Sequence, residues 1–242
     1  MATYTSSMTR GTTAEYARQV PAPTAATTLT MSLVACGIVS GPLFFVVAIV
    51  QMAIRPGFDL RRHAISLLSL GDLGWIQITN FAVTGVLFIL CAIGLRRRLQ
   101  GGIGGTWGPA LIGVCGLAAA TAAIFHPDPG LSFPPGAPAG MPATMSWHAT
   151  LHMLAFCTAF LSLIAACFVF LRRFTSQGRR GWGIYCVATG IVSPILIILG
   201  MSNKNWVGVF MAIGVGVAFA WVSAIAARFA TESVQSDPQL HE

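Results

Sequence analysis

Six apolar runs, each about 20 residues long, determine the class of fold that this chain can adopt. They lie at residues 29–54, 75–95, 107–125, 147–171, 181–201 and 206–229. A helix of that length crosses the hydrocarbon core of a bilayer while satisfying all of its own backbone hydrogen bonds. The pattern therefore predicts an all-α fold, a polytopic integral membrane bundle of six transmembrane helices.

The composition supports a lipid-embedded protein. Charged residues make up 9% of the chain, whereas a soluble domain carries about 25%. Tryptophans stand at the starts of five runs, as in the aromatic belts of membrane proteins: Trp75, Trp107, Trp147, Trp182 and Trp206. We expect a multi-pass protein of the cell membrane whose first partner is the lipid bilayer.

The distribution of arginines predicts the orientation of the bundle. Clusters at 96–98 and 172–180 follow the second and fourth runs, and together with the chain ends they give that side ten basic residues against four. Because basic loops stay in the cytoplasm, both termini are predicted to be cytoplasmic. The net charge of +7 is gathered in these loops rather than on a soluble face, so no nucleic-acid partner is expected.

Polar segments flank the membrane domain. Residues 1–28 are rich in Thr, Ala, Ser and Pro and cannot bury a core, so we expect a disordered tail. Residues 29–230 form the six-span domain, and 231–242 form a short polar C-terminal tail. The six cysteines lie within apolar runs and form no CxxC pair, which is typical of small buried hydrophobic residues.

Titratable side chains gather in two short stretches that the topology places on one side of the bilayer. The stretches are 55–72 and 126–152, and two spans separate them. They hold four of the five histidines and all three acidic residues found between positions 30 and 230: Asp59, His63, Asp72, His126, Asp128, His148 and His152. Since so apolar a chain does not need ionisable groups to fold, we interpret this face as a candidate site.

Two of these histidines suggest a metal. His148 and His152 are spaced i, i+4 at the start of the fourth span, so they share one helix face. A loop residue such as His63, His126 or Asp128 can supply a third ligand, which predicts a zinc site. The alternative is that both are interfacial histidines hydrogen-bonded to loop carbonyls.

His63 and Ser66 form a second pair, spaced i, i+3 in the first loop. A histidine beside a serine can act as base and nucleophile, although a serine at such a place more often caps or packs a turn. The arginines of the same loop, Arg55, Arg61 and Arg62, are candidates for binding lipid phosphates. Ordinary snorkelling to the interface is the alternative for all three.

Asp128 lies between two prolines just after the third run. A carboxyl group at a low-dielectric boundary has a raised pKa, so Asp128, or Asp59 in the first loop, is a candidate general acid. An Asp-Pro turn or a pairing with a first-loop arginine is the structural alternative for Asp128.

Three short motifs carry a resemblance to a known family. They are RPGFD at 55–59, HAISLL at 63–68 and FHPDP at 125–129. Together with His152 at the opening of the fourth span, they resemble the bacterial six-helix membrane family catalogued as domain of unknown function 998. The resemblance covers residues 30–228 and implies six spans, without an established activity.

The pattern of that family falls on His63, Ser66, Asp128 and His152 of this chain. The chain departs from the pattern at His126, where a small or apolar residue is expected, and by the additional His148.

The convergence of these side chains beside an apolar bundle favours an enzyme acting on a lipidic or isoprenoid substrate. Metal-assisted hydrolysis fits, as does acid-initiated cyclisation, with Asp128 or Asp59 donating the proton and Trp75 and Trp147 stabilising a cation. The alternatives are a permease-like lipid- or solute-handling protein and a non-catalytic membrane partner. The spans carry no central charge and no paired broken helices, which weakens the case for a permease.

Overall fold

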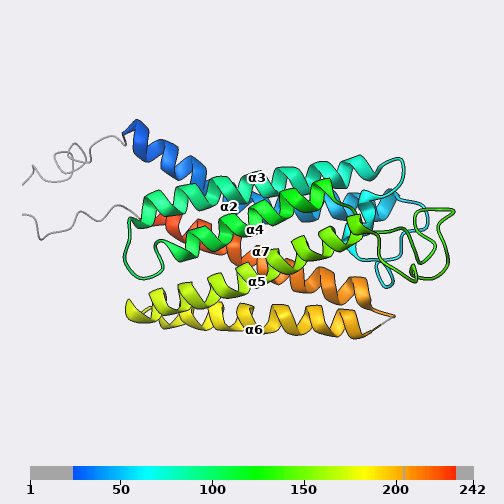
Figure 1. Cartoon of the computed structure of the whole chain (residues 1–242). Coiled ribbons are helices and arrows are strands. Elements are labelled where there is room, and N and C mark those ends of the chain that lie inside the picture. The colour runs from blue at the N-terminus through cyan, green and yellow to red at the C-terminus, as the bar shows by residue number, and fades with distance from the viewer. Residues whose placement is uncertain (1–23, 204, 233–242) are drawn as a thin grey trace, which may run out of the picture.

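The computed structural model describes residues 24–203 and 205–232, and these form a helical bundle (Figure 1). The long helices are α2 (Ala25–Ile54), α3 (Gly74–Leu99), α4 (Trp107–Ile124), α5 (Trp147–Ser176), α6 (Arg180–Ser202) and α7 (Val207–Thr231). A short 3-10 helix, η1 (Ile65–Ser69), follows α2. The six long helices are all long and apolar enough to cross a membrane, which confirms the predicted fold class.

The helices match the predicted runs, with extensions of several residues at the start of α2 and at the ends of α3, which continues past 95 to Leu99, and α5. α2 begins at Ala25 because the backbone N–H of Thr27 donates to Thr24 Oγ1 at 3.3 Å, an N-cap. Residues 25–28, predicted as part of the disordered tail, are therefore helical. The rest of that tail, 1–23, and residues 233–242 lie outside the described residues. α5 continues past its predicted end at 171 to Ser176.

The helices form a closed ring. Each packs against the next in sequence, and α7 returns to pack against α2. Small residues allow a close approach of α3 and α4: a Cβ at Gly85 would lie 2.6 Å from the carbonyl oxygen of Gly116, and a Cβ at Gly116 would lie 2.7 Å from that of Gly85. Such glycine contacts bring membrane helices together where lipid offers no hydrophobic driving force.

Aromatic rings fill the space between α3, α5 and α7. The rings of Phe88 and Phe219 meet edge to face, with 5.0 Å between their centroids. Phe170 lies 5.7 Å from Trp221 and 6.0 Å from Phe229. Such pairs contribute about 0.5–1.5 kcal/mol each beyond their buried area, and they make the centre of the bundle a packed core.

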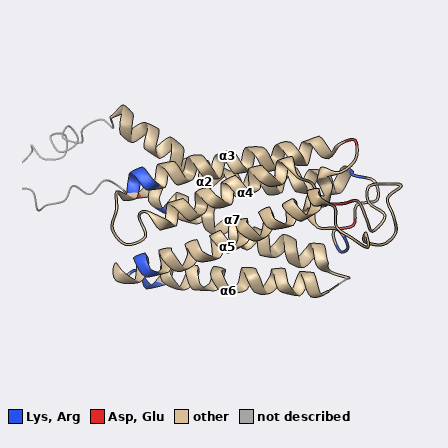
Figure 2. Ribbon diagram, viewed as in Figure 1, with Lys and Arg blue, Asp and Glu red and all other residues tan. Residues whose placement is uncertain are grey.

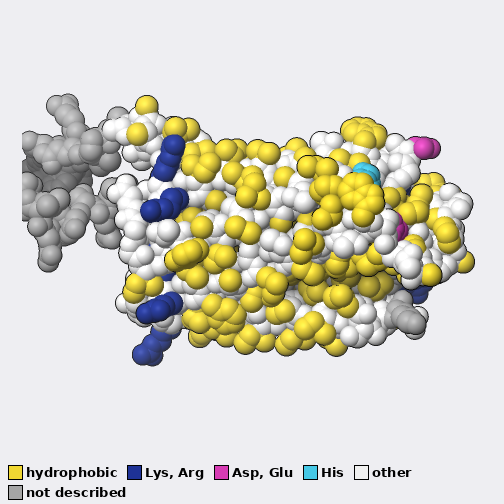
Figure 3. All heavy atoms as spheres, viewed as in Figure 1, with side chains coloured by type: hydrophobic (Ala, Val, Ile, Leu, Met, Phe, Trp, Pro, Cys, Tyr) yellow, Lys and Arg dark blue, Asp and Glu magenta, His cyan; other side chains and the backbone are white. Residues whose placement is uncertain are grey.

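The surface divides into an apolar belt and two polar ends. Hydrophobic side chains cover the helical belt (Figure 3), and the charged residues lie beyond it (Figure 2). We call the end with Arg96–Arg98 and Arg172–Arg180 the arginine end. The opposite end, formed by residues 55–73 and 125–146, is the loop end. The predicted titratable face is this loop end.

Candidate functional site

The two loops of the loop end interlock around Phe133, a residue that the sequence analysis did not single out. Its side chain is 0% exposed. The ring lies 5.3 Å from the rings of both Phe58 and His63, and the guanidinium carbon of Arg55 stands 5.2 Å from its centroid. Phe133 therefore joins the loop after α4 to the loop after α2.

His63 connects the same two loops through both ring nitrogens. The backbone N–H of Asp59 donates to Nδ1 at 2.9 Å, so Nδ1 carries no proton. Nε2 must then carry it, and it donates to the carbonyl oxygen of Leu131 at 3.0 Å. The neutral imidazole is fully hydrogen-bonded, and its bonds are structural.

The predicted His63–Ser66 pair is not formed. Both nitrogens of His63 are occupied, and Ser66 stands in η1, where its carbonyl oxygen accepts the hydroxyl of Ser69 at 2.7 Å. The i, i+3 argument assumed a regular α-helix, but residues 55–64 form turns and η1 begins only at Ile65. The geometry required for a base and a nucleophile is therefore missing here.

The three first-loop arginines have separate positions. Arg55 is buried and donates to the carbonyl oxygens of Leu68, at 3.0 Å, and Leu70, at 2.5 Å. Because those carbonyls end η1, Arg55 fastens η1 to the end of α2. Arg61 is exposed and pairs with Asp59 at 3.5 Å, and Arg62 is exposed as well. Arg55 therefore bonds backbone carbonyl oxygens of the protein itself, whereas Arg61 and Arg62 lie at the surface.

Both candidate acids are held in the ionised form. The side chain and the backbone N–H of Ser146 hold the pKa of Asp128 below its ordinary value, and the N–H···Oδ2 distance is 2.7 Å. The backbone N–H of Arg61 likewise lowers the pKa of Asp59. The expected raised pKa of Asp128 is therefore wrong, because the carboxylate lies beside the N-terminus of α5 and not in an apolar pocket.

The predicted histidine pair on α5 is divided between two partners. His152 Nδ1 donates to the carbonyl oxygen of Phe125 at 2.8 Å, which is the loop-carbonyl alternative. His148 instead lies parallel to His126, with ring centroids 5.7 Å apart. No group of three His, Cys, Asp or Glu side chains within residues 24–203 and 205–232 is placed to hold a metal. The predicted zinc site at His148 and His152 thus has no third ligand in the described part of the chain.

A polar cluster that the sequence analysis missed lies inside the bundle, directly below the loop end. Gln51 on α2 donates through Nε2 to Gln77 Oε1 on α3 at 2.7 Å. Asn80 donates to the same oxygen at 3.3 Å and to the carbonyl oxygen of Phe44 at 3.0 Å. Thr84 stands one turn beyond Asn80 on the same face of α3. We call Gln51, Gln77, Asn80 and Thr84 the amide cluster.

The amide cluster is buried but incompletely hydrogen-bonded. Its four side chains are at most 4% exposed. Gln51 Oε1, Gln77 Nε2, Asn80 Oδ1 and Thr84 Oγ1 each have no hydrogen-bond partner among the described residues. Thr84 lies ten residues into α3, about 15 Å along the helix axis. The cluster therefore extends polar, unpaired atoms from the loop end toward the middle of the bundle.

One sequence signal could have revealed this cluster. Gln51, Gln77 and Asn80 are the only carboxamide side chains in the described helices α2–α7, and all three fall near the same end of neighbouring helices. The predicted site was based on ionisable residues alone, but an uncharged amide in hydrocarbon also requires a hydrogen-bond partner.

The fold and this site define a six-span integral membrane protein with a neutral polar interior beneath a closed loop end. A family model described as "Protein of unknown function (DUF998)" matches residues 38–228. The chain belongs to this family, as its loop motifs predicted. The comparisons with curated proteins and with solved structures returned no match.

Proposed function

We propose that this protein binds a neutral amphiphile, a lipid or lipid-like solute, whose polar group is held by the amide cluster. One observation carries the proposal: four buried polar atoms of the cluster lack hydrogen-bond partners among the described residues. A buried group left unpaired costs roughly 1–3 kcal/mol, so apolar side chains replacing hydrogen-bonded partners of the cluster together would give a more stable bundle. A ligand that pairs with the cluster recovers part of that free energy when it binds.

The chemistry of the cluster favours an uncharged hydroxyl or amide group. Each carboxamide offers a donor and an acceptor whichever way it is turned, and Thr84 offers both. None of the four side chains is ionisable, so a charged headgroup would be buried without a counter-charge at a large desolvation cost. The apolar helices around the cluster suit the hydrocarbon part of the same molecule.

The loop end supplies the entrance in this proposal. η1 packs against α2 and α3, the two helices that carry the cluster, and four of its five residues are buried. Arg55 fastens η1 through two carbonyl oxygens. Movement of η1 would open the cluster to a ligand while leaving the ring of helices intact.

The test is ligand binding by detergent-purified protein, followed as thermal stabilisation. Monoolein and farnesol serve as neutral probes, with oleate and dodecylamine as charged counterparts. We expect stabilisation by the neutral probes only, and its loss in the double variant Gln77→Leu/Asn80→Leu. Ser193→Ala is the matched control, because its buried hydroxyl donates to Gly214 on the other side of the bundle. Binding that survives in the double variant would contradict the proposal.

An enzyme acting on a lipidic or isoprenoid substrate has less support from the same geometry. Cyclisation needs a protonated acid, whereas Asp128 and Asp59 have lowered pKa values. Hydrolysis needs a metal or an activated nucleophile, whereas His63 and His152 bond backbone carbonyls. Turnover of an isoprenoid diphosphate by the purified protein, abolished by Asp128→Ala, would favour the enzyme over a binding protein.

The orientation belongs to the proposal too. The arginine end carries most of the basic residues described, so the positive-inside rule puts it in the cytoplasm and opens the loop end to the outside. A cysteine at Ala139 in the loop end should react with a membrane-impermeant maleimide in intact cells. A cysteine at Gln177 at the arginine end should not, and the reverse pattern would invert the bundle.

A further inference from the structure

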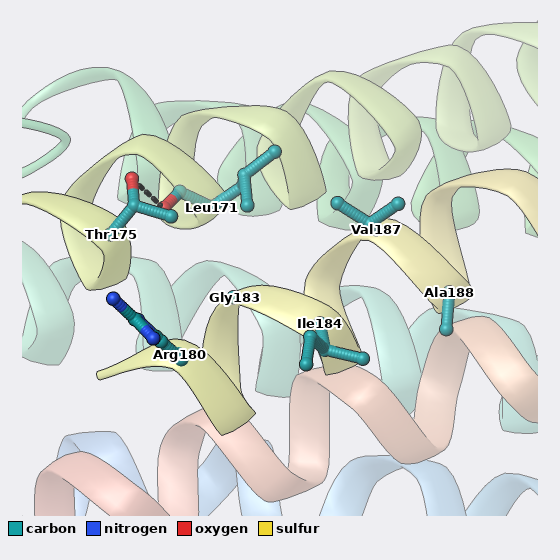
Figure 4. Close-up of a pocket in the computed structure, with 7 residues that line it drawn as sticks. All are labelled: Leu171, Thr175, Arg180, Gly183, Ile184, Val187 and Ala188. Atoms are coloured by element: carbon teal, nitrogen blue, oxygen red, sulfur yellow. Dashed lines mark hydrogen bonds between the residues drawn. The ribbon is translucent and has the colours of Figure 1, made fainter. Parts of the chain in front are cut away.

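A groove at the arginine end, far from the amide cluster, has the form of a lipid site. It runs between the end of α5 and the start of α6, with a volume of about 430 Å³, within the usual range for ligand sites. Figure 4 shows Leu171 and Thr175 on α5, and Arg180, Gly183, Ile184, Val187 and Ala188 on α6. Four of these seven residues have aliphatic side chains, and Arg180 is the one charged member.

The groove has the length of one leaflet. From Arg180 to Ala188 α6 rises about 12 Å, close to half of the roughly 30 Å hydrocarbon core. Ile184, on its border, is 70% exposed, so this face of α6 lies toward the lipid. Because residue 183 is a glycine, no side chain occupies the space between α6 and α5 at this point of the groove. A Cβ at Gly183 would lie 3.3 Å from Thr175 Cγ2 and 3.4 Å from Leu171 Cδ1.

The charge at the mouth of the groove is uncompensated within the described residues. Glu232, the acidic residue described at this end, already pairs with Arg179 at 2.9 Å and Arg228 at 2.6 Å. Arg180 is exposed and makes no ion pair or side-chain hydrogen bond among residues 24–203 and 205–232. α6 also begins at Arg180 without a side-chain cap, so its helix dipole adds positive potential there.

We propose that this groove binds one anionic phospholipid, with the phosphate on Arg180 and one acyl chain along Leu171, Val187 and Ala188. The groove supplies the apolar surface and Arg180 supplies the charge, and a diester phosphate on an acyl chain is complementary to both. The site is distinct from the amide cluster in position and in the charge of its ligand.

The experiment measures binding of dioctanoyl-phosphatidylglycerol to the full chain in neutral detergent by native mass spectrometry. We expect one lipid per chain, with dioctanoyl-phosphatidylcholine binding at least tenfold more weakly. Arg180→Gln should weaken phosphatidylglycerol binding about tenfold. Arg97→Gln, which removes an exposed arginine of α3 at the same end, should change it less than twofold. Equal losses in both variants would indicate diffuse attraction to the arginine end and overturn the proposal.

A second pair of variants tests the groove without changing charge. Ala188→Phe fills the path of the chain from a lipid-exposed position and should weaken binding about tenfold, whereas Ala110→Phe, exposed on α4, should not. Unchanged binding in Ala188→Phe would exclude the acyl-chain position. Competition by glycerol phosphate alone, at the same concentration as the lipid, would identify a soluble-anion site instead.

Discussion

Replacing the Gln51–Gln77 pair by leucines, singly and together, is the sharpest test of the incomplete hydrogen bonding in the amide cluster. We take about 1 kcal/mol for each buried hydrogen bond and about 2 kcal/mol for each unpaired buried atom. Gln51→Leu removes one bond but also the unpaired Gln51 Oε1, so it should stabilise the protein by about 1 kcal/mol.

Gln77→Leu should act in the opposite direction. Gln77 Oε1 accepts from both Gln51 and Asn80, so two bonds are lost, and Gln51 Nε2 becomes a new unpaired donor. Removal of the unpaired Gln77 Nε2 offsets only part of this, which leaves a loss of about 2 kcal/mol. Asn80 keeps its bond to Phe44.

The double variant removes both unpaired atoms, Gln51 Oε1 and Gln77 Nε2. It leaves no new unpaired donor at position 51, because Gln51 is replaced as well. It should be about 2 kcal/mol more stable than the wild type, although the single effects add to a loss of about 1 kcal/mol. The coupling between the two positions is therefore about 3 kcal/mol. The net gain of about 2 kcal/mol corresponds to a Tm about 4–8 °C above the wild type for the double variant. Thermal unfolding in a neutral detergent without added lipid measures it. A double variant less stable than the wild type would refute the reasoning, because the cluster would then be structural.

Three further predictions concern the loop end and the contact between α3 and α4. Asp128→Asn should cost about 0.5–1 kcal/mol of stability. Because the folded pKa of Asp128 is lowered, the stabilisation by its carboxylate is complete above the ordinary pKa of about 3.9 and is lost as the pH falls through the folded value. Between pH 7 and pH 3, the measured Tm should therefore fall less in the variant than in the wild type. Phe133→Ala should cost about 3–5 kcal/mol locally, and limited proteolysis should then cut residues 125–146 with the six helices still resistant. Gly85→Leu should prevent the approach of α3 to Gly116 and lower Tm sharply, whereas Gly113→Leu, whose Cβ would meet only Ala92 at 3.4 Å, should lower it less.

The hydropathy pattern predicted the architecture because membrane insertion depends on it directly. Each of the six apolar runs became a helix, since no other open structure satisfies its backbone in lipid. The ends were less predictable: α2 begins at Ala25 and not at 29 because one hydroxyl, that of Thr24, caps it. That contact has no counterpart in a hydropathy average.

The placement of the titratable loop residues at one end was predictable, but their hydrogen bonds were not. The sequence analysis placed His63, Asp128 and His152 at one end, where the structure has them. It could not indicate that backbone groups far along the chain would occupy them, such as the carbonyl of Leu131 on His63. The amide cluster was overlooked for a related reason: Gln51 and Gln77 become partners only when α2 and α3 pack.

The closed ring of helices has a consequence for how the protein is made. The first and last spans share a seam in which the Ser223 hydroxyl donates to the carbonyl oxygen of Gly37 at 3.1 Å, and a Cβ at Gly37 would lie 2.8 Å from Ala226 Cβ. During synthesis, α2 enters the membrane before α7 has been made. The face of α2 that contains Gly37 is therefore exposed to lipid until α7 is inserted. The insertion of α7, and not that of any earlier helix, is therefore the step at which this ring of helices can close.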